Sequence, residues 1–512
     1  MTSFRPIAFA FSLSLFVVFI LGLHAESCLD PIPEVEGKRT YNFPDFSKYR
    51  RPRTLSLSEL KLDDPNGRVI IIGDIHGMNK SFHHLLSAMS YSPQTDTVIL
   101  AGDFLAKSTP ESSLAILDFL IQSLGRVYAV RGNHDHMVVQ WRAWREWFEP
   151  LKIGHRTGAD FLTTIEAEWE GERRNDVDAD EWAEKARRRA AGTWRAKWWR
   201  RIPYSGSGPK KNQWSIFSEH YWLARDMTQT QAELLYSSPS VLHLPSAHMF
   251  VVHAGILPFD PRRPPTDERQ PLAHKPEVKG QLDDTQQIFS ASDNVSVEKL
   301  RTLQEKALLT DIRGNRDPWV LMNMRSIEDG QVTRDGDKGT PWTELWNDQM
   351  GRCVGFDDDL SRTEVTPRIR HAAYSDALSE SDASRGALPC HPSTVVYGHA
   401  ASRGLDVKRW TIGLDTGCIY GGKLTGLVLQ RRSPDNSPGV DSMDTTEADE
   451  DEDEEYYDNW TRSRLARSGS ELRRRERELS RPRRKHVKFG DIHTGLRGAL
   501  VSISCRGQEG LG

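Results

Sequence analysis

Three short polar motifs in the first third of the chain each follow directly on an apolar run. The runs and their motifs are Val69–Ile72 before Gly73-Asp74-Ile75-His76-Gly77, Thr97–Ala101 before Gly102-Asp103, and Val127–Val130 before Gly132-Asn133-His134-Asp135. Bounded runs of this length, rich in Val and Ile, are typical of buried strands. Open α/β sheets bind ligands where the strands give way to loops. The pattern therefore predicts a polar site at one edge of a buried sheet.

The segments between these runs, Ser81–Ser90 and Leu114–Ser123, have the apolar spacing of helices. Alternating strands and helices predict a largely parallel layer in an α/β fold. Later in the chain, strands are expected near 394–397, 410–414 and 424–430, and a helix around Val297–Leu309. No internal repeat is evident in the sequence.

Two distant histidines also end apolar runs: His253 follows Val251-Val252, and His399 follows Val395-Val396-Tyr397-Gly398. Asp, Asn and His side chains suit a pair of divalent metals, and paired metals suit hydrolysis of phosphate esters or anhydrides. The five cysteines include no pair with zinc-binding spacing. Alternatively, each of these residues is simply a buried polar group at the start of a loop, as lone histidines at strand ends usually are.

The order of these motifs resembles the calcineurin-like metallophosphoesterases of the phosphoprotein phosphatase superfamily, over about residues 68 to 430. The resemblance implies an α/β sandwich of two mixed sheets flanked by helices. It also implies two metal ions, with Asp103 bridging them and His134 as general acid. The implied ligands are Asp74, His76 and Asp103 for one ion, and Asp103, Asn133, His253 and His399 for the other.

The second motif indicates the branch of this superfamily. Ala106 and Lys107 stand where protein Ser/Thr phosphatases carry an Asp that pairs with the acid histidine and a phosphate-binding Arg. An Ala followed by a basic residue resembles the diadenosine tetraphosphatase (ApaH) branch and its eukaryotic relatives. Because Ala106 cannot orient His134, Asp135 is the candidate to replace the missing Asp.

Further segments resemble the fungal ApaH-like group, which contains vacuolar zinc-dependent endopolyphosphatases. They are 414–425, 317–319 with 323–325, and 339–342. The resemblance implies internal cleavage of inorganic polyphosphate, with zinc preferred and manganese, cobalt or iron also compatible. The alternatives are hydrolysis of dinucleoside polyphosphates or nucleotide caps, a protein Ser/Thr phosphatase, and an inactive polyphosphate-binding membrane protein.

Four basic residues are expected to contact an anionic substrate: Lys107, Arg131, Arg325 and Lys423. Asp415 is either such a contact or a structural tie beside the site. Cys418 is interpreted as a packing residue, since it has no paired base that would make it a nucleophile. Cys353 and Cys390 are candidates for a disulfide.

The expected organisation has one catalytic domain at its centre. It comprises a signal anchor or signal peptide (1–25), a lead-in linker (26–66), the catalytic domain (67–432) with a Trp- and Arg-rich helical insertion (about 141–225), a disordered acidic and basic segment (433–485), and a tail (486–512). In the tail, Ala499–Cys505 is expected to return as a strand beside 424–430. The basic residues of the insertion are either a solvated face or a track for a long polyanion.

Residues 7–23 are largely apolar, with Arg5 before them and Glu26 after them. This charge order predicts that the rest of the chain crosses into the lumen of the secretory pathway, with the vacuole as its destination and the membrane as a partner. The sequons at Asn294 and Asn459 are compatible with that placement. The expected partners are the polyphosphate substrate and the membrane, and no nucleic acid is expected.

We expect the apolar segment to be retained as an anchor, because Leu23-His24-Ala25 lacks the small residues of a cleavage site. Sequencing the N-terminus of the mature protein checks this, and the expected result is that residues 1–23 are still present. A mature start near Glu26 would contradict the anchor and favour a cleaved signal peptide.

Overall fold

The computed structural model describes residues 52–173, 177–203, 214–278, 296–356, 386–431, 482–491 and 494–506. They divide into two compact units. The smaller unit contains the described part of Phe148–Ile216, and the larger one contains the described parts of Pro44–Trp147 and Phe217–Gly512. All of the motifs belong to the larger unit.

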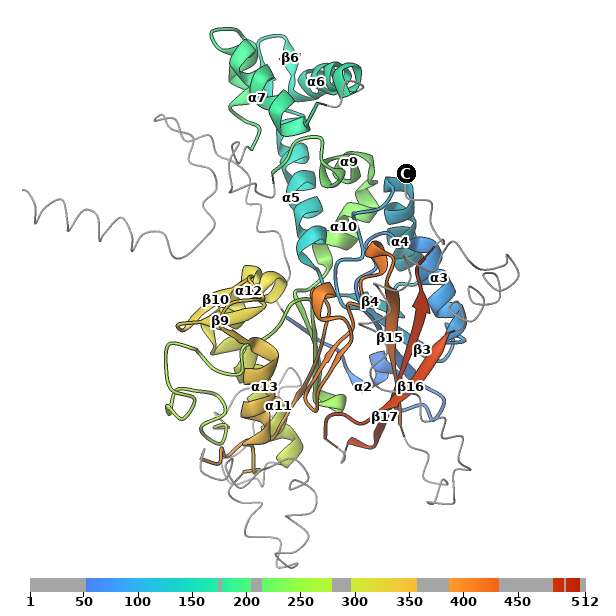
Figure 1. The fold of residues 1–512 in the computed structure, drawn as a ribbon, viewed down its shortest axis with the longest axis vertical. Helices are drawn as coiled ribbons and strands as arrows, with labels where there is room; N and C mark the ends of the chain where they lie inside the picture. Colours follow the sequence, from blue (N-terminus) through green and yellow to red (C-terminus); the bar gives the residue numbers. More distant parts are fainter. Residues whose placement is uncertain are drawn as a thin grey trace, which may run out of the picture. The chain divides into compact units, whose positions relative to one another are not determined.

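Two six-stranded mixed sheets form the larger unit (Figure 1). In the first, the strand order is β16 (Arg483–Val487), β17 (Leu496–Ser504), β15 (Lys423–Arg431), β2 (Arg68–Ile72), β3 (Asp96–Leu100) and β4 (Val127–Ala129). In the second, it is β1 (Arg53–Thr54), β7 (Val241–Leu244), β8 (Met249–Val252), β12 (Thr394–Tyr397), β14 (Thr411–Gly413) and β13 (Asp406–Val407). The β2, β3 and β4 strands run parallel, as the sequence predicts.

Helices cover the sheets of the larger unit (Figure 1). They are α2 (Leu57–Leu60), α3 (Asn79–Ala88), α4 (Pro110–Gln122), α5 (Asn133–Phe148), α9 (Glu219–Asp226), α10 (Gln229–Ser237), α11 (Val297–Thr310), α12 (Pro318–Asn323) and α13 (Trp342–Gly351). A small sheet of β9 (Ser326–Glu328), β10 (Gln331–Thr333) and β11 (Thr340–Pro341) lies between α12 and α13 in the chain. Short 3-10 turns are η2 (Pro245–Ala247), η3 (Arg313–Arg316), η6 (Ala401–Arg403) and η7 (Cys418–Tyr420).

The side chains of the strands alternate between two apolar cores, as a period of two requires. Val251 of β8 packs in the core between the sheets, together with Val69 and Ile71 of β2. Phe250 and Val252 point to the other side, into a second core. This core also contains Trp342 and Trp346 of α13, and Leu308 and Leu309 of α11. Each sheet is therefore buried on the face that meets its partner, which fixes the strand ends that carry the motifs.

The prediction of a lead-in linker over 26–66 is wrong for the described residues 52–66. Arg53–Thr54 pairs in parallel with β7 as an edge strand, and Leu55, Leu60 and Leu62 are buried in the core between the sheets. The polar composition of this region concealed three leucines spaced to reach the core. Residues 1–51, including the apolar N-terminal segment, lie outside the described part of the chain.

The chain returns to the first sheet after the acidic and basic segment. Strand β17 pairs antiparallel with β15 over its full length, so Ala499–Ser504 lies beside 424–430 as the sequence analysis expects. The expected boundary at 485 is wrong, because Arg483, Arg484 and Lys485 are already part of β16. Residues 432–481, which carry the acidic run and Asn459, are outside the described residues, as is Asn294.

Two disulfides tie the larger unit together. Cys353 bonds to Cys390, as the sequence suggested. Cys418 bonds to Cys505, so its interpretation as a simple packing residue is wrong. The second bond joins the loop after β14 to the end of β17, two segments separated by 87 positions in the sequence.

The smaller unit corresponds to the central part of the Trp- and Arg-rich insertion, but it spans fewer residues than the expected range of about 141–225. Helix α5 continues without a break from Asn133 to Phe148, and α9 belongs to the larger unit. The smaller unit contains β5 (Lys152–Ile153), β6 (Arg156–Thr157), α6 (Gly158–Glu172), α7 (Ala179–Ala190) and α8 (Arg195–Trp199). Trp182 and Trp198 are buried within it, consistent with a packing role.

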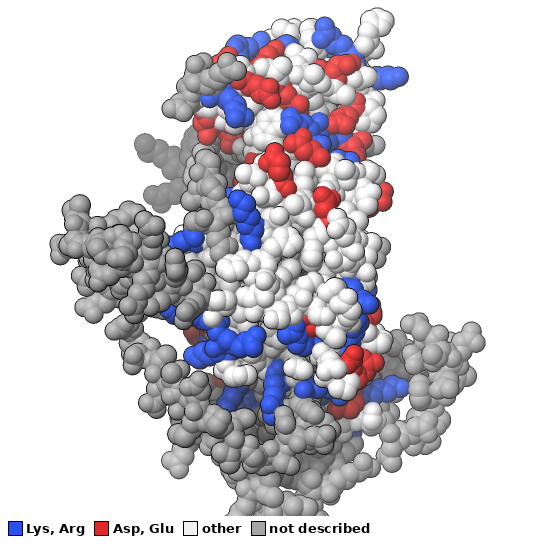
Figure 2. Space-filling model, turned by 90° about the vertical axis from the view of Figure 1, so that its right-hand side faces the viewer, with Lys and Arg blue, Asp and Glu red and all other residues white. Residues whose placement is uncertain are grey.

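Acidic neighbours pair with several basic residues of the smaller unit. Lys185 and Arg188 form ion pairs with Glu181 and Glu184 one turn earlier on α7, and the Arg195 guanidinium lies 2.6 Å from Glu168. Blue and red side chains are mixed over the top of the view in Figure 2, where α6 to α8 lie. On the face that this view shows, the mixture of charges in the described residues favours the solvated-face interpretation. Within the described residues, no helix combines the length and apolarity that crossing a membrane requires.

The Cys418–Cys505 disulfide should contribute measurably to stability. A cross-link that closes a long loop restricts the unfolded chain, and its removal typically costs about 2–5 kcal/mol. We expect the C418A/C505A variant to lose about that much free energy of unfolding in urea titrations, and the wild type to lose at least as much in reductant, which also opens the Cys353–Cys390 bond. An unchanged urea midpoint in both cases would contradict this contribution.

Candidate active site

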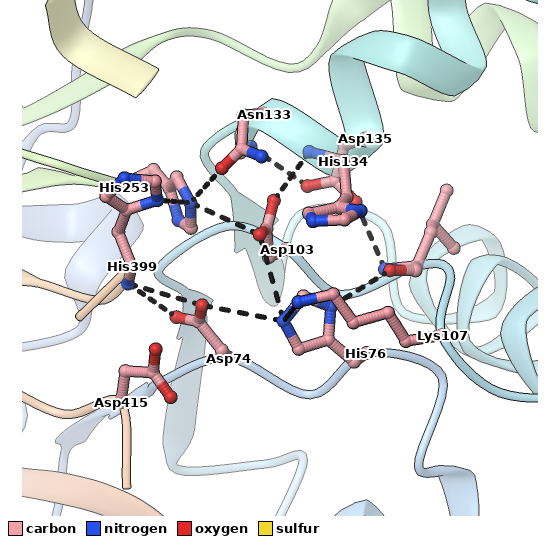
Figure 3. Close-up of polar contacts among 12 residues, drawn as sticks. Asp74, His76, Asp103, Lys107, Asn133, His134, Asp135, His253, His399 and Asp415 are labelled. Carbon is pink, nitrogen blue, oxygen red and sulfur yellow. Dashed lines mark hydrogen bonds and ion pairs between the residues drawn. The ribbon is translucent and has the colours of Figure 1, made fainter. Parts of the chain in front are cut away.

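The polar residues of the motifs converge where strands of both sheets end (Figure 3). Asp74 and His76 follow β2, Asp103 follows β3, and Asn133 and His134 open α5 after β4. His253 and His399 come from the second sheet, after β8 and β12. The structure therefore brings all six expected metal ligands to one place, although they span more than 300 positions in the sequence.

Donor atoms form two clusters that share Asp103. Those of Asp74, His76 and Asp103 lie within 4.8 Å of one another, as do those of Asp103, His253 and His399. Asn133 joins the second cluster, because its Oδ1 lies 3.1 Å from His253 Nε2. The residues of these clusters are those of the two ligand sets implied by the resemblance, and Asp103 belongs to both.

Three of these side chains are held by the backbone of their neighbours. The main-chain N–H of His399 donates to both carboxylate oxygens of Asp74, at 3.1 and 3.2 Å. The N–H of His134 donates to Asp103 Oδ1 at 2.9 Å. His253 Nδ1 lies 3.1 Å from the carbonyl of Ala101, which leaves Nε2 toward the cluster. Such partners orient ligands before a metal arrives.

The backbone at the site adopts the left-handed region at several residues other than glycine. His76, Asp103, Ala106, Lys107 and His399 have φ values between 46° and 69°. Each such residue costs of order 1–3 kcal/mol and persists only where its surroundings enforce it. Five of them in the loops of one site indicate that these loops are shaped for a ligand.

The charge balance of the cluster fits metal binding. Burial opposes a charge on His253, but Asp103 and Asp74 outweigh it and raise the pKa of His253 to about 10. Burial lowers the pKa of His76 to about 3 and the pKa of His399 well below its usual range, so both imidazoles are neutral. Metal ligands must be deprotonated, so His253 would lose its proton when it binds a metal. The positive charge of divalent cations would then balance the carboxylates of Asp74 and Asp103 in place of that proton.

Asp415 is a structural tie rather than a contact to an anion. Its carboxylate accepts the N–H of Gly417 at 3.2 Å and lies beside Asp74 (Figure 3). Burial, with the adjacent Asp415 next in importance, raises the pKa of Asp74 well above its usual range. Two carboxyl groups so close favour one shared proton or a nearby cation.

His134 lies beside the first cluster, with its ring 5.2 Å from that of His76. The suggestion that Asp135 orients it is wrong. The Asp135 carboxylate accepts the backbone N–H groups of Gly132 and Leu105, at 2.9 and 3.1 Å, and so ties the second motif to the third. The partner of the His134 ring is His220, whose Nε2 lies 2.9 Å from His134 Nδ1.

Lys107 is an expected substrate contact whose side chain reaches a residue of the first cluster. Its Nζ is 3.2 Å from His76 Nε2 and donates to the hydroxyl of Tyr420, also at 3.2 Å. Its own backbone N–H donates to Glu219 Oε2 at 2.8 Å. Sequence reasoning missed Glu219 and His220, since neither stands in a recognisable motif, and it gave no role to Tyr420, although this residue lies in the segment 414–425.

Arg131 does not serve as a substrate contact. Its side chain is 1% exposed, and its guanidinium donates to the carbonyls of Leu235, Tyr236 and Ser238 at the end of α10. Arg325 lies beside the site, where its guanidinium donates to the carbonyl of His399 at 3.2 Å. Lys423 opens β15 and is tied through its backbone to Thr416.

Comparison with known proteins agrees with this geometry. Residues 67–244 match the family described as calcineurin-like phosphoesterase. A symmetrical bis(5'-nucleosyl)-tetraphosphatase from Haemophilus ducreyi is 42% identical over 65 residues, which are 13% of this chain and 23% of that protein. The corresponding protein of Glaesserella parasuis is 42% identical over 66 residues, again 13% and 23%. The chain thus spans about a quarter of the length of the curated relatives it matches.

A solved structure assigned to a diadenosine tetraphosphatase is 19% identical and covers 74% of this chain and 94% of its own, with a TM-score of 0.34. At that score the likeness carries no argument. The part of the chain that carries the first three motifs is thus similar to the calcineurin-like phosphoesterases, with local similarity to symmetrical bis(5'-nucleosyl)-tetraphosphatases, and the two ligand clusters agree with that similarity. Enzymes of this superfamily use two divalent metal ions, and the donor set described above fits that pair.

Gly398 gives a sharp test of the ligand geometry. A Cβ at this position would lie 2.0 Å from Asp74 Oδ1, which is too close for any contact. We expect Gly398→Ala to displace the Asp74 carboxylate and to reduce metal content and phosphatase activity at least about tenfold, as loss of ligand positioning does.

Gly171 in α6 is the matched control, because a Cβ there meets nothing within 4 Å. Gly171→Ala should leave metal content and activity unchanged. Normal metal content in a folded Gly398→Ala protein, measured by elemental analysis, would contradict the role of Asp74 as a ligand.

Proposed function

We propose that this protein is a two-metal hydrolase of phosphoanhydride bonds and that it cleaves inorganic polyphosphate internally. The observation that supports this most directly is the pair of donor clusters that share the Asp103 carboxylate. Next to them stand a candidate acid, His134, and a lysine ammonium that reaches His76. Metal ligands, a proton donor and a fixed cation together suit the hydrolysis of a phosphate chain.

Different residues of this chain would bind the metal ions, bind the substrate and protonate the leaving group. The first ion would be held by Asp74, His76 and Asp103, and the second by Asp103, Asn133, His253 and His399. When bound, two such ions neutralise the phosphoryl oxygens and activate the attacking water. Lys107 would hold a substrate phosphate as a point charge, and His134 would protonate the leaving oxygen. Arg325 would assist by fixing the loop that carries His399.

The substrate proposal also depends on the compartment. The disulfides Cys353–Cys390 and Cys418–Cys505 support an oxidising environment, where such bonds persist. Together with the apolar N-terminal segment and the sequons, they favour the lumen of the secretory pathway and, by resemblance, the vacuole. We propose zinc as the metal, because a mixed set of imidazole and carboxylate ligands suits it.

A second candidate is the hydrolysis of dinucleoside polyphosphates. The local match to symmetrical bis(5'-nucleosyl)-tetraphosphatases supports it, and so does Tyr420. This tyrosine is 70% exposed at the rim of the site, with the Lys107 ammonium 5.4 Å from its ring centroid. An exposed aromatic ring next to a phosphate-binding cation could stack on a nucleobase.

A gel of long-chain polyphosphate after incubation with the metal-loaded protein tests the proposal. Internal cleavage should shift the whole population to shorter chains, in a reaction that a chelator stops. Release of terminal phosphate from otherwise intact chains would contradict internal cleavage. Unchanged polyphosphate together with hydrolysis of diadenosine tetraphosphate would favour the second candidate.

Asp103→Asn is the variant that tests the metal assignment, because it keeps the shape of the shared residue but removes its charge. We expect its turnover to fall by at least about 10²-fold, since it would weaken the binding of both ions. Gly171→Ala serves again as the matched control and should retain full turnover. Undiminished turnover of D103N would refute the two-metal assignment.

A further inference from the structure

A fifth histidine, His220, contacts His134 and stands outside every motif. His220 is the second residue of α9 and is 5% exposed. Its Nε2 lies 2.9 Å from His134 Nδ1, and the two rings are 27° from parallel with centroids 5.1 Å apart. That distance is typical of a hydrogen bond between two ring nitrogens, one of which carries the proton.

This contact takes the place of an interaction that the second motif lacks. Ala106 has no polar atom with which to hold the ring of His134. The Asp135 carboxylate is engaged by the backbone N–H groups of Gly132 and Leu105. His220 is therefore the side chain that the ring of His134 has as its hydrogen-bond partner.

We propose that His220 is a positioning residue for His134, which it orients through the hydrogen bond between His134 Nδ1 and its own Nε2. The backbone N–H of His134 is fixed on Asp103 Oδ1, and His220 fixes the ring, so the side chain is held at both ends. With Nδ1 occupied, Nε2 is the nitrogen of His134 that remains to face a leaving group. The inference deepens the proposed function and rests on it for the role of His134.

Glu219, the neighbour of His220, extends the same support to Lys107. Its Oε2 accepts the backbone N–H of Lys107 at 2.8 Å, at a residue whose φ of 61° needs to be held in place. The first turn of α9 thus holds both the candidate acid and the candidate phosphate contact. Both contacts come from outside the motif loops.

A third metal ion is the competing interpretation, because donor atoms of His134, Glu219 and His220 lie within 4.8 Å of one another. Tetrahedral zinc with bonds of about 2.0–2.1 Å would hold two nitrogens about 3.3 Å apart. The observed 2.9 Å between the ring nitrogens and the 3.7 Å between His220 Nε2 and Glu219 Oε1 fit a hydrogen-bonded pair better.

The direct test is nitrogen NMR of the metal-loaded full-length protein with labelled histidine. A hydrogen bond between ring nitrogens should give a scalar coupling between His134 Nδ1 and His220 Nε2, and the coupling should vanish in His220→Leu. Absence of the coupling in the wild type would overturn the proposal. This readout requires no turnover, so its failure is distinct from a failure of the proposed function.

The kinetic test uses a series of aryl phosphates, from nitrophenyl to phenyl phosphate. A nitrophenolate departs without a proton, whereas phenolate benefits from a positioned acid. For His220→Leu we expect kcat on phenyl phosphate to fall about 10–100-fold, with a much smaller loss on nitrophenyl phosphate and an unchanged KM. His220→Gln should recover much of the loss, since its amide oxygen can accept from Nδ1.

His155→Leu, at an exposed histidine of the smaller unit, is the matched control and should behave as the wild type. An equal loss of kcat on all aryl phosphates in His220→Leu would indicate a general structural role and overturn the proposal. So would the loss of a third equivalent of metal, which would identify a metal site instead of a positioning pair.

Discussion

The structure depends on the burial of carboxylates among imidazoles where the two sheets meet. Asp74 and Asp103 are 4% and 2% exposed, and they share this space with His76, His253 and His399. Burying charge in this way is costly unless it is paired or holds a metal. Three features of the backbone keep these groups together. They are the positions of the strand ends, the strained loops and the glycines that let backbone segments approach closely.

The second sheet contributes more than a packing surface. It brings His253 and His399 to a site whose other ligands come from the first sheet, so the site exists only when the two apolar faces are packed. The Cys418–Cys505 bond closes the loop beside Asp74 onto strand β17, which the chain reaches only after the long acidic and basic segment. Stability of the fold and geometry of the site are therefore coupled.

The surroundings of His134 show how a departure from a motif can be compensated elsewhere in the chain. Ala106 removes a partner for the acid histidine, and α9 supplies another from more than 80 positions away. The same turn of α9 supports Lys107. A substitution that appears damaging in the motif is accommodated by a helix that the motif does not include.

The sequence by itself determined the α/β class, the parallel strands β2 to β4 and the residues that gather at the site. It could do so because each of these features is local: an apolar run, a glycine turn and a polar residue directly after it. Only the tertiary structure decided the partners of these residues. Contacts between distant segments are the examples. His220 contacts His134, and Cys418 bonds to Cys505. The Asp135 carboxylate accepts backbone N–H groups, and the Arg131 guanidinium donates to carbonyls at the end of α10. No local pattern specifies such contacts, because they depend on which surfaces meet when the two sheets pack.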